Sequence, residues 1–503
     1  MENIAFFFMA WLDPNLIILT ALGTFLGIYI GAIPGLSVTM AVSILISFTF
    51  RWDVNNALAL MVGIFMGGVY GGARTAILLN IPGAPAAIAT ALDGYPLAQK
   101  GQAGQAIGLS TVMSGIGGFV GILVLAIAAP SLSEFALTFQ PRDYLLVALL
   151  GILLVGALAG DSLAKCIFAG SLGVVIGMVG LDPLTAQERF TLGHVSLWSG
   201  ISPVVAMIGL FGVAEVLRQL HFMGAARVRQ DIGKLVPRIS DIRRHLSLTM
   251  QSAGIGSVIG ALPGTGGDVA ALMAYDHARR VTRNPEVPFG EGAKEGLIAP
   301  EAANNAAVGG SFVPMLTLGI PGDAVTAIFI GALFIHGLNP GPMLMVETPY
   351  IFWFIVGTLV LANIFLIIFG LTGIRLFVRI VQIPRGILLP LILLLSVVGA
   401  YALANSLADV WWVLAFGVLG YLMKLYGFQV GPVVLGIILS RLIDDNWRRM
   451  MISERDDLGA VLQGILSSPL STTLALVVIL LLLGQTPIWT RLRNRLAARL
   501  RRS

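Results

Sequence analysis

The chain has little charge and almost no cysteine. Of its 503 residues, 11% are charged, and Cys166 is the only cysteine. A single cysteine excludes an internal disulfide and a cysteine-based metal site. The sequence contains no Gly-x-x-x-x-Gly-Lys-[Ser/Thr] motif, which argues against direct drive by ATP. Because residues 1–15 have no basic segment and no small-residue cleavage site, we do not expect a removable signal peptide.

Apolar residues dominate the chain instead. Hydrophobic residues make up 57% of it, and the mean hydropathy is +0.90. Runs long enough to cross a bilayer include 15–33, 107–129 and 351–369. At roughly 20 residues per crossing, we expect about 11–13 transmembrane segments. The composition therefore predicts an all-α polytopic membrane protein, with some helices broken or re-entrant.

The net charge is +5, and basic residues concentrate in 223–245 and 491–503. The positive-inside rule places both segments in the cytoplasm. A basic tail can bind nucleic acid, but beside a final apolar span we interpret it as a topology anchor and expect no nucleic-acid partner. The expected parts are a first repeat unit 1–222, a linker 223–245, a second repeat core 246–345, scaffold helices 346–490 and a tail 491–503.

Two interrupted apolar stretches indicate an internal repeat. Residues 296–343 read GLIAPEAANNAAVGGSFVPMLTLGIPGDAVTAIFIGALFIHGLNPGPM, with breaks expected at Pro300, Gly309-Gly310, Pro314, Gly319, Pro321-Gly322 and Pro340. Residues 67–102 have the same order of a Gly-Gly pair, an apolar run, an Ile-Pro-Gly break and a final Asp-Gly turn. Paired interruptions of this kind point to two repeated halves. The matches are Pro34-Gly35 with Pro263-Gly264 (offset 229), Gly71-Gly72 with Gly309-Gly310 (238), Pro82-Gly83 with Pro321-Gly322 (239) and Asp93-Gly94 with His336-Gly337 (243).

The Pro-Gly breaks predict a binding site inside the bilayer. Lipid cannot replace a lost backbone hydrogen bond, so a broken helix must line a wet cavity or be buried in protein. The N–H groups that begin the next helix suit an anionic carboxylate. A purely structural kink is the alternative at each break. The expected substrate-binding residues are Gly35, Arg74, Thr75, Asn80, Pro82, Gly83, Gly264, Asn304, Asn305, Gly310, Pro321 and Gly322.

Acidic side chains near the breaks are candidates for a coupling-ion site. Glu301 shares a predicted helix face with Asn304 and Asn305, at i, i+3 and i+4. Their oxygens suit Na+, and a carboxylate can carry a proton instead. The asparagines alternatively join helices to one another. Asp268 and Asp323 follow corresponding breaks, and each either binds the coupling ion or caps a helix N-terminus.

Arg74 lies between the Gly-Gly pair and the Ile-Pro-Gly break of the first half. A guanidinium stays protonated and pairs bidentately with carboxylates, so Arg74 is a candidate clamp for an acidic substrate. The alternatives are snorkelling to the membrane interface or pairing with a protein acid, namely Asp93, Asp268 or Asp323.

Three long segments carry a family resemblance. They are NIPGAPAAIATALDGYPLAQKGQAGQAIG from Asn80, ALPGTGGDVAALMAYDHARR from Ala261 and EGLIAPEAANNAAVGGSFVPMLTLGIPGDAVTAIFIGAL from Glu295. They resemble the large membrane subunit of the tripartite tricarboxylate transporters, the TctA family, over nearly the whole chain. Arg74 departs from the small or apolar residue expected at its position.

The resemblance implies uptake of a carboxylate across the bacterial inner membrane, driven by a cation gradient. The substrate would be a tricarboxylate such as citrate, or a related dicarboxylate or aromatic carboxylate. The implied partners are a small integral membrane subunit and a periplasmic solute-binding protein, beside the lipid bilayer. No cofactor other than coupling Na+ or H+ is expected, and no enzymatic activity. The alternatives are a membrane-embedded hydrolase using Asp268 and Asp276 and a passive anion channel.

Overall fold

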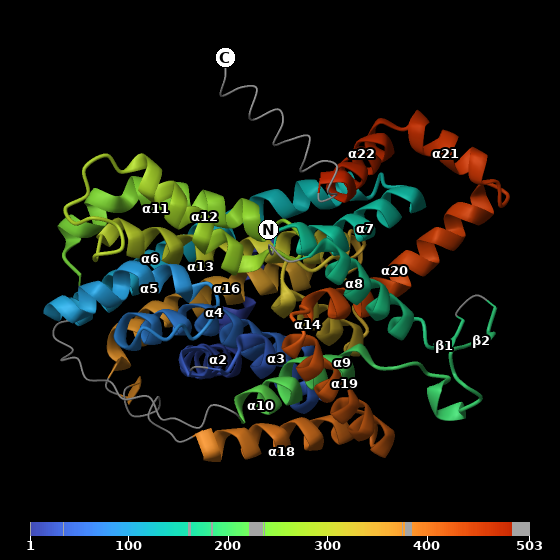
Figure 1. Cartoon of the computed structure of the whole chain (residues 1–503), viewed down its shortest axis with the longest axis horizontal. Coiled ribbons are helices and arrows are strands. Elements are labelled where there is room, and N and C mark those ends of the chain that lie inside the picture. The colour runs from blue at the N-terminus through green and yellow to red at the C-terminus, as the bar shows by residue number, and fades with distance from the viewer. Residues whose placement is uncertain are drawn as a thin grey trace. The chain divides into compact units, whose positions relative to one another are not determined.

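The computed structural model describes residues 2–33, 35–158, 162–182, 185–220, 235, 237–374, 376–377 and 385–484. Pro34, most of the expected linker 223–245 and the whole tail 491–503 lie outside these residues. Nearly all of the described regular structure is helical. The chain forms two compact units, Met1–Glu134 with Val204–Leu425 and Phe135–Pro203 with Tyr426–Ser503 (Figure 1).

The first unit contains the two repeats and the helices around them. The N-termini of its early helices are capped by Asp13, Ser37 and Asp53, whose side chains accept backbone N–H groups. The elements are α1 Glu2–Leu12, α2 Pro14–Ala32, α3 Val38–Thr49, α4 Val54–Leu79, α5 Ala87–Leu97, η1 Ala98–Gln102, α6 Ala103–Ala136, α9 Pro203–Met207, η3 Ile208–Val213, α10 Ala214–Gln219, α11 Ile239–Gly260, α12 Gly266–Val281, α13 Lys294–Leu318, α14 Ala324–Ile335, α15 Leu344–Glu347, α16 Pro349–Thr372, α18 Arg385–Ala404 and α19 Leu407–Leu425.

The second unit packs α7 and α8 against α20. Arg448 of α20 pairs with Asp182 and Asp444, and Arg189 of the β-hairpin pairs with the same two acids. Helices α21 and α22 are bent by 104° at a short break. The elements are α7 Pro141–Leu158, α8 Leu163–Gly177, β1 Gly180–Leu181, β2 Glu188–Arg189, η2 Val195–Leu197, α20 Gly431–Ser453, α21 Leu458–Ser467 and α22 Pro469–Gly484.

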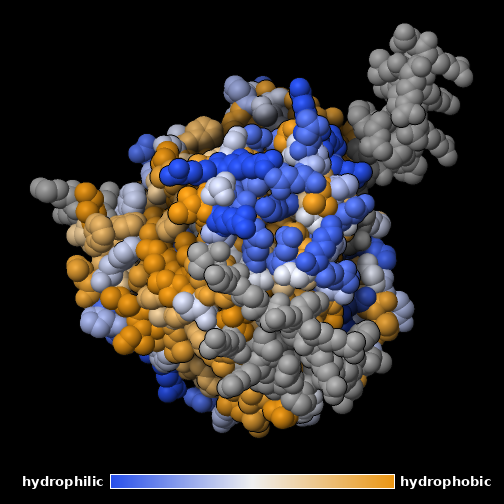
Figure 2. All heavy atoms as spheres, turned by 90° about the vertical axis from the view of Figure 1, so that its left-hand side faces the viewer, coloured by the Kyte–Doolittle hydropathy of each residue, from blue (hydrophilic) through white to orange (hydrophobic). Residues whose placement is uncertain are grey.

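The helices confirm an all-α polytopic membrane protein. Among the described residues, six helices are long and apolar enough to cross a membrane, or up to seven if the bent pair counts as one span. This number is below the predicted 11–13 because interrupted segments form apolar helices of only 10–17 residues, among them α3 and α14. Figure 2 shows hydrophobic side chains exposed over a broad part of one face, as contact with lipid requires, beside a region of hydrophilic residues.

The repeats are visible in how their helices pack. A Cβ at Gly27 of α2 would overlap the backbone of Ile64 in α4, and a Cβ at Gly256 of α11 would overlap the backbone of Ala303 in α13. The residue numbers of the two glycines, Gly27 and Gly256, differ by 229, and those of the residues they meet, Ile64 and Ala303, differ by 239. Small residues permit this close approach of membrane helices. The α2–α4 pair is therefore built like the α11–α13 pair, and Figure 1 shows each pair side by side.

The same contacts correct the predicted register of the long helices by one residue. Gly71 faces the backbone of Ile28, and Gly310 faces the backbone of Ser257. Gly71 therefore corresponds to Gly310, at an offset of 239, and the predicted match with Gly309 was wrong. A Gly-Gly pair in the sequence does not specify which glycine faces the neighbouring helix.

Each long helix ends in the same way. Asn80 after α4 and Gly319 after α13 are left-handed, with φ of 54° and 71°, and both donate their N–H to carbonyls of the last turn. After α4 the chain folds back, and the N–H of Gly83 reaches the carbonyl of Gly72 at 3.4 Å. Each interruption therefore lies beside its own long helix.

The two long helices cross in opposite directions. The amide of Asn304 in α13 donates to the carbonyl of Val69 in α4 at 3.3 Å. The rings of Phe65 and Phe312 lie 5.9 Å apart. Residue numbers therefore rise along α4 in the direction in which they fall along α13, so the two helices are antiparallel. Antiparallel equivalent helices are the relation expected of inverted repeats.

Three of the expected breaks are absent. Helix α13 runs without interruption through Pro300, Gly309-Gly310 and Pro314, which were predicted to break it. Prolines are tolerated inside membrane helices when neighbouring helices satisfy the freed carbonyls. Asp93, predicted to lie in a turn, is inside α5. Helix α11 begins at Ile239, so 239–245 belongs to it and not to a linker.

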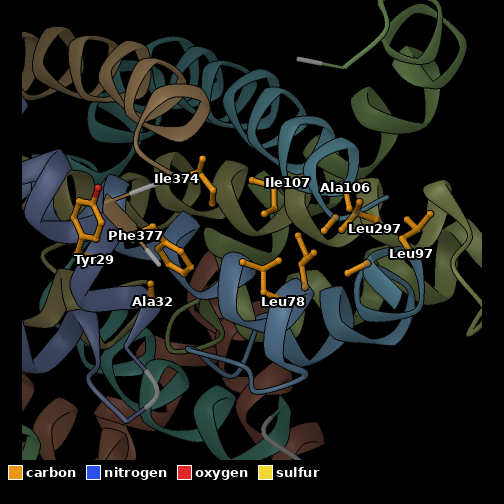
Figure 3. Packing of buried hydrophobic residues seen from close by; sticks show 12 residues of the cluster. Tyr29, Ala32, Leu78, Leu97, Ala106, Ile107, Leu297, Ile374 and Phe377 are labelled. Atoms are coloured by element: carbon orange, nitrogen blue, oxygen red, sulfur yellow. The ribbon is translucent and has the colours of Figure 1, made fainter. Parts of the chain in front are cut away.

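A buried hydrophobic cluster joins the first repeat to α13. Figure 3 shows Leu78 of α4, Leu97 of α5 and Ile107 of α6 facing Leu297 of α13, with Phe377 at the other end of the cluster. Close packing of such side chains supplies dispersion energy where lipid offers no hydrophobic driving force. The cluster holds α5 and α13 in contact.

Arg74 lies beside this cluster and is 1% exposed. Its Nη2 donates to the carbonyls of Phe369 and Gly370 in the last turn of α16, at 3.0 and 2.6 Å, and Nε donates to Tyr70 at 3.3 Å. The guanidinium also lies 5.2 Å from the ring centroid of Phe377. Arg74 therefore caps the C-terminus of α16, whose last carbonyls have no helical partner.

Replacing Gly322 by alanine tests the fold-back of the second repeat, in which the chain after α13 returns to lie against that helix. A Cβ there would lie 2.5 Å from Cα of Ser311 and 2.7 Å from the carbonyl oxygen of Gly260. We expect a loss of roughly 1–3 kcal/mol of stability, measured as a lower melting temperature in detergent. Gly254→Ala is the control, since its added Cβ meets no atom within 4 Å. Equal melting temperatures for both variants would contradict the packing described.

Arg74→Gln tests the capping role. Losing charged donors to two buried carbonyls is expected to cost on the order of 1–3 kcal/mol, seen as a lower melting temperature. Arg74→Lys keeps a positive donor and should lose less. An unchanged melting temperature together with abolished uptake would instead favour a substrate clamp.

Candidate functional site

The interruptions of the two halves lie against the ends of their own helical hairpins. The Cβ position of Gly83 meets the carbonyl of Gly31, near the end of α2, and that of Gly322 meets the carbonyl of Gly260, at the end of α11. The hairpin turns themselves use left-handed glycines, Gly35 with φ of 95° and Gly264 with φ of 78°. In each repeat, therefore, a hairpin tip and a fold-back meet beside the C-terminal half of the long helix.

The two repeats are joined at these points. The carboxylate of Asp268, in the first turn of α12, accepts the N–H of Ala86 at the start of α5, at 3.0 Å. The Cβ position of Gly266 lies 3.1 Å from Cβ of Asp323, at the start of α14. By accessible surface Asp268 is exposed and Asp323 half-buried, although both lie deep among the surrounding helices. We call this region, from Ala86 through Asp268 to Asp323, the central cluster.

Helix N-termini converge on the central cluster. Helices α12 and α14 begin in it, and α5 begins directly after Ala86. Asp323 caps α14 by accepting the N–H of Thr326 at 2.7 Å, and Asp268 caps α5 of the other repeat. The start of α12 has no side-chain cap, because the hydroxyl of Thr265 donates to backbone carbonyls instead. N-termini carry partial positive charge, so the cluster suits an anion.

Asn304 connects the central cluster to the crossing of the long helices. It is 6% exposed, its amide nitrogen donates to Val69, and a Cβ at Gly267 would overlap its Oδ1. Thr75 lies at the fold-back of the first repeat: its hydroxyl oxygen is 3.1 Å from the Cβ position of Gly83, and its hydroxyl donates to the carbonyl of Gly72. The break residue Pro82 is half-buried beside it.

Other predicted residues have structural partners. Asn80 is an exposed left-handed cap. Gly310 packs on α11, and Pro321 is buried in its break. Asn305 donates to the carbonyl of Glu301 within its own helix at 3.0 Å. Arg74 contacts α16, and no described contact connects it to the central cluster.

Glu301 and Asn304 lie one turn apart on α13 but contact different neighbouring helices. The carboxylate of Glu301 accepts hydroxyls from Thr90 of α5 and from Ser110 and Ser114 of α6. These three hydroxyls were missed by sequence reasoning. The spacing of Ser110 and Ser114, one turn apart in an apolar helix, was the available signal. It is weak, since such hydroxyls usually bond to their own helix.

The far end of α5 is fixed to the start of α13. One oxygen of Asp93 accepts the N–H groups of Gly290, Gly292 and Ala293, each at 2.8 Å, and the other accepts the hydroxyl of Tyr275 at 2.9 Å. Asp93 of the first repeat therefore caps the N–H groups of the residues directly before α13, which belongs to the second repeat. Beyond it lies a cavity of about 290 Å³, lined by side chains of both charges including Lys100, Arg238, Glu286, Lys294 and Glu295.

Among the described residues, no group of three or more histidine, cysteine or acidic side chains is placed to hold a metal ion. The central cluster and the Glu301 hydroxyls instead supply single carboxylates, amides, hydroxyls and backbone N–H groups. Such groups recognise anions and small hard cations rather than transition metals.

Comparisons with known proteins identify a family. The family model described as "Tripartite tricarboxylate transporter TctA family" matches residues 17–435. The chain is 37% identical over 483 residues to an "uncharacterized 52.8 kDa protein in TAR-I ttuC' 3'region" of Agrobacterium vitis, covering 96% of each. It is 39% identical over 202 residues to an "uncharacterized protein in TAR-II ttuC' 3'region" of the same organism, covering 40% of this chain and 83% of that one.

No solved structure matches the chain. The family match covers most of the sequence, including both repeats and every residue of the central cluster. The resemblance seen in the sequence is thereby confirmed, and the multi-pass helical architecture is that of a transmembrane transporter. The chain belongs to the tripartite tricarboxylate transporter TctA family.

Proposed function

We propose that this chain is the membrane subunit of a secondary active transporter that imports an organic carboxylate across the bacterial inner membrane. The substrate is a tricarboxylate, or a related dicarboxylate or aromatic carboxylate. A periplasmic binding protein delivers it, a small integral membrane subunit completes the system, and a Na+ or H+ gradient drives accumulation. Family membership supports the substrate class and the partners.

The observation that carries this proposal is the convergence of interrupted helices from two antiparallel repeats. Helix starts from both repeats meet at the central cluster, where Asp268 is exposed and Asp323 half-buried. Discontinuous helices at the interface of repeats are typical of substrate sites in secondary transporters. The N–H groups at the start of α12 are free of a side-chain cap and suit a substrate carboxylate.

The substrate site consists of these N–H groups and the polar side chains beside them. The amide nitrogen of Asn304 has two hydrogens and can donate one to a substrate oxygen and one to Val69. The hydroxyl of Thr75 instead donates to the carbonyl of Gly72 in its own helix, at 3.2 Å. The break glycines allow close approach of the substrate to the backbone. A substrate carboxylate beside Asp268 and Asp323 would suffer repulsion, which a bound cation or proton relieves. This repulsion gives a physical reason for coupling substrate to a positive ion.

Uptake is measured in vesicles containing this chain and both partner subunits, with labelled di- and tricarboxylates. We expect accumulation against a concentration gradient when an inward Na+ or H+ gradient is imposed, and equilibration alone without one. Accumulation with neither gradient, or transport of uncharged solutes at the same rate, would contradict the proposal.

Asn304→Ala tests the substrate site. Loss of one hydrogen bond to a charged ligand costs about 1.5–3 kcal/mol, so we expect KM for uptake to rise roughly tenfold or more. Asn284→Ala, in an exposed loop, serves as the control. If KM of the Asn304 variant equals that of the control while both fold normally, Asn304 does not contact the substrate.

A further inference from the structure

A carboxylate in the middle of α13 is enclosed by hydroxyl groups. Glu301 is 1% exposed. Thr90 of α5 donates to its Oε1 at 2.5 Å, and Ser110 and Ser114 of α6 donate to its Oε2 at 3.1 and 2.9 Å. The cluster therefore joins α13 to two neighbouring helices through oxygen atoms alone.

No charged side chain of the described residues contacts Glu301. Arg74 of α4 faces α16, and Asp93 of α5 faces the residues before α13. His245 of α11 pairs with Glu295, and the groups of α6 in contact are the two serines. A lone carboxylate with no positive partner is costly in such an interior. The side chain must therefore be neutralised by a proton or a bound cation.

The distances favour a proton. Oxygens that ligate a metal cation surround it and point at the ion. Here the hydroxyl oxygens lie at direct hydrogen-bond distance from the carboxylate oxygens, so the hydroxyls are turned toward Glu301. The Thr90 hydroxyl can donate to a carboxylate oxygen or accept from a carboxylic acid, so this contact serves both charge states of Glu301. One added proton neutralises this site without separating its oxygens.

Glu301 is also connected to the central cluster through both helices that hold it. In α13 it lies one turn before Asn304, which bonds to α4. In α5, its partner Thr90 lies one turn after Ala86, whose N–H is held by Asp268. Protonation of Glu301 therefore changes the hydrogen bonding of the two helices that border the substrate site.

We propose that Glu301 is the residue that carries the coupling proton, with Thr90, Ser110 and Ser114 as its hydroxyl cage. Resting on the proposed function, this assignment identifies H+ as the driving ion. The carboxylate binds one proton from one side of the membrane, the repeats rearrange with substrate bound, and the carboxyl group releases that proton to the other side. No other bond is made or broken.

In the part of the chain that the structure describes, the first repeat has no counterpart of this site. At the offset of 239 that relates the long helices, Val62 of α4 corresponds to Glu301, and Phe329 corresponds to Thr90. The first repeat thus has an apolar side chain where the second has its carboxyl group. The hydroxyl cage therefore contributes one proton-binding carboxyl group.

Glu301→Gln separates coupling from substrate translocation. The amide mimics the protonated, neutral side chain, so we expect exchange of internal for external substrate within about twofold of the unaltered protein. Accumulation driven by a pH gradient should fall at least tenfold, and substrate-dependent alkalinisation of the medium should disappear. Glu291→Gln, in an exposed loop, is the control and should retain both activities.

The outcomes distinguish this assignment from the proposed function. Accumulation by Glu301→Gln at the rate of the control would overturn the assignment, as would accumulation by the unaltered protein that follows a Na+ gradient and ignores pH. Absence of substrate exchange in the unaltered, partner-supplied protein would instead contradict the proposed function itself.

A second measurement uses the unaltered protein, so its result does not depend on whether a variant folds. Hydrophobic carbodiimides modify buried carboxyl groups only when these are protonated. We expect mass spectrometry of the treated protein to find the adduct on Glu301, in an amount that falls as the pH of labelling rises. Labelling that is independent of pH, or found on Asp268 and Asp323 but absent from Glu301, would contradict the proposal.

Discussion

The fold depends on how backbone groups freed by helix interruptions find partners inside the membrane. Lipid supplies neither donors nor acceptors, so each interruption must be satisfied by protein or water. In this chain each fold-back lies against its own long helix, where glycine allows backbone to approach backbone. The remaining N–H groups are capped by carboxylates, Asp323 within one repeat and Asp268 across the two. Because Asp268 satisfies an N–H group of the other repeat, capping these N–H groups also brings the interruptions of the two repeats together.

The repeats share their packing but not their chemistry. Glycines at the α2–α4 and α11–α13 contacts recur at constant offsets of 229 and 239. The polar side chains do not recur: Val62 and Phe65 occupy the positions that Glu301 and Asn304 occupy in the second repeat. Duplication explains why both halves have glycines at corresponding positions, where their helices come into close contact. Function needs only one set of polar groups at the interface between them.

Two buried charges of opposite sign are stabilised in different ways. Arg74 meets carbonyls at the end of α16, where the helix dipole is negative. Glu301 meets hydroxyls, which can donate to a carboxylate or accept from a carboxylic acid. The arginine is fixed in one charge state because a guanidinium does not lose its proton. The glutamate is not, and for this reason Glu301 suits a reversible role while Arg74 suits a structural one.

The sequence by itself determined the membrane class, the repeat and the positions of the Pro-Gly interruptions that the structure describes. These follow from composition and from residues whose backbone properties are local: proline lacks an N–H, and glycine permits close approach. Tertiary structure alone decided that α13 continues through Pro300 and Pro314, that Gly71 corresponds to Gly310, and that Arg74 contacts α16. It also brought Thr90, Ser110 and Ser114 to Glu301. Those outcomes depend on which side of a helix meets which neighbour, and contacts between segments distant in the chain set that orientation.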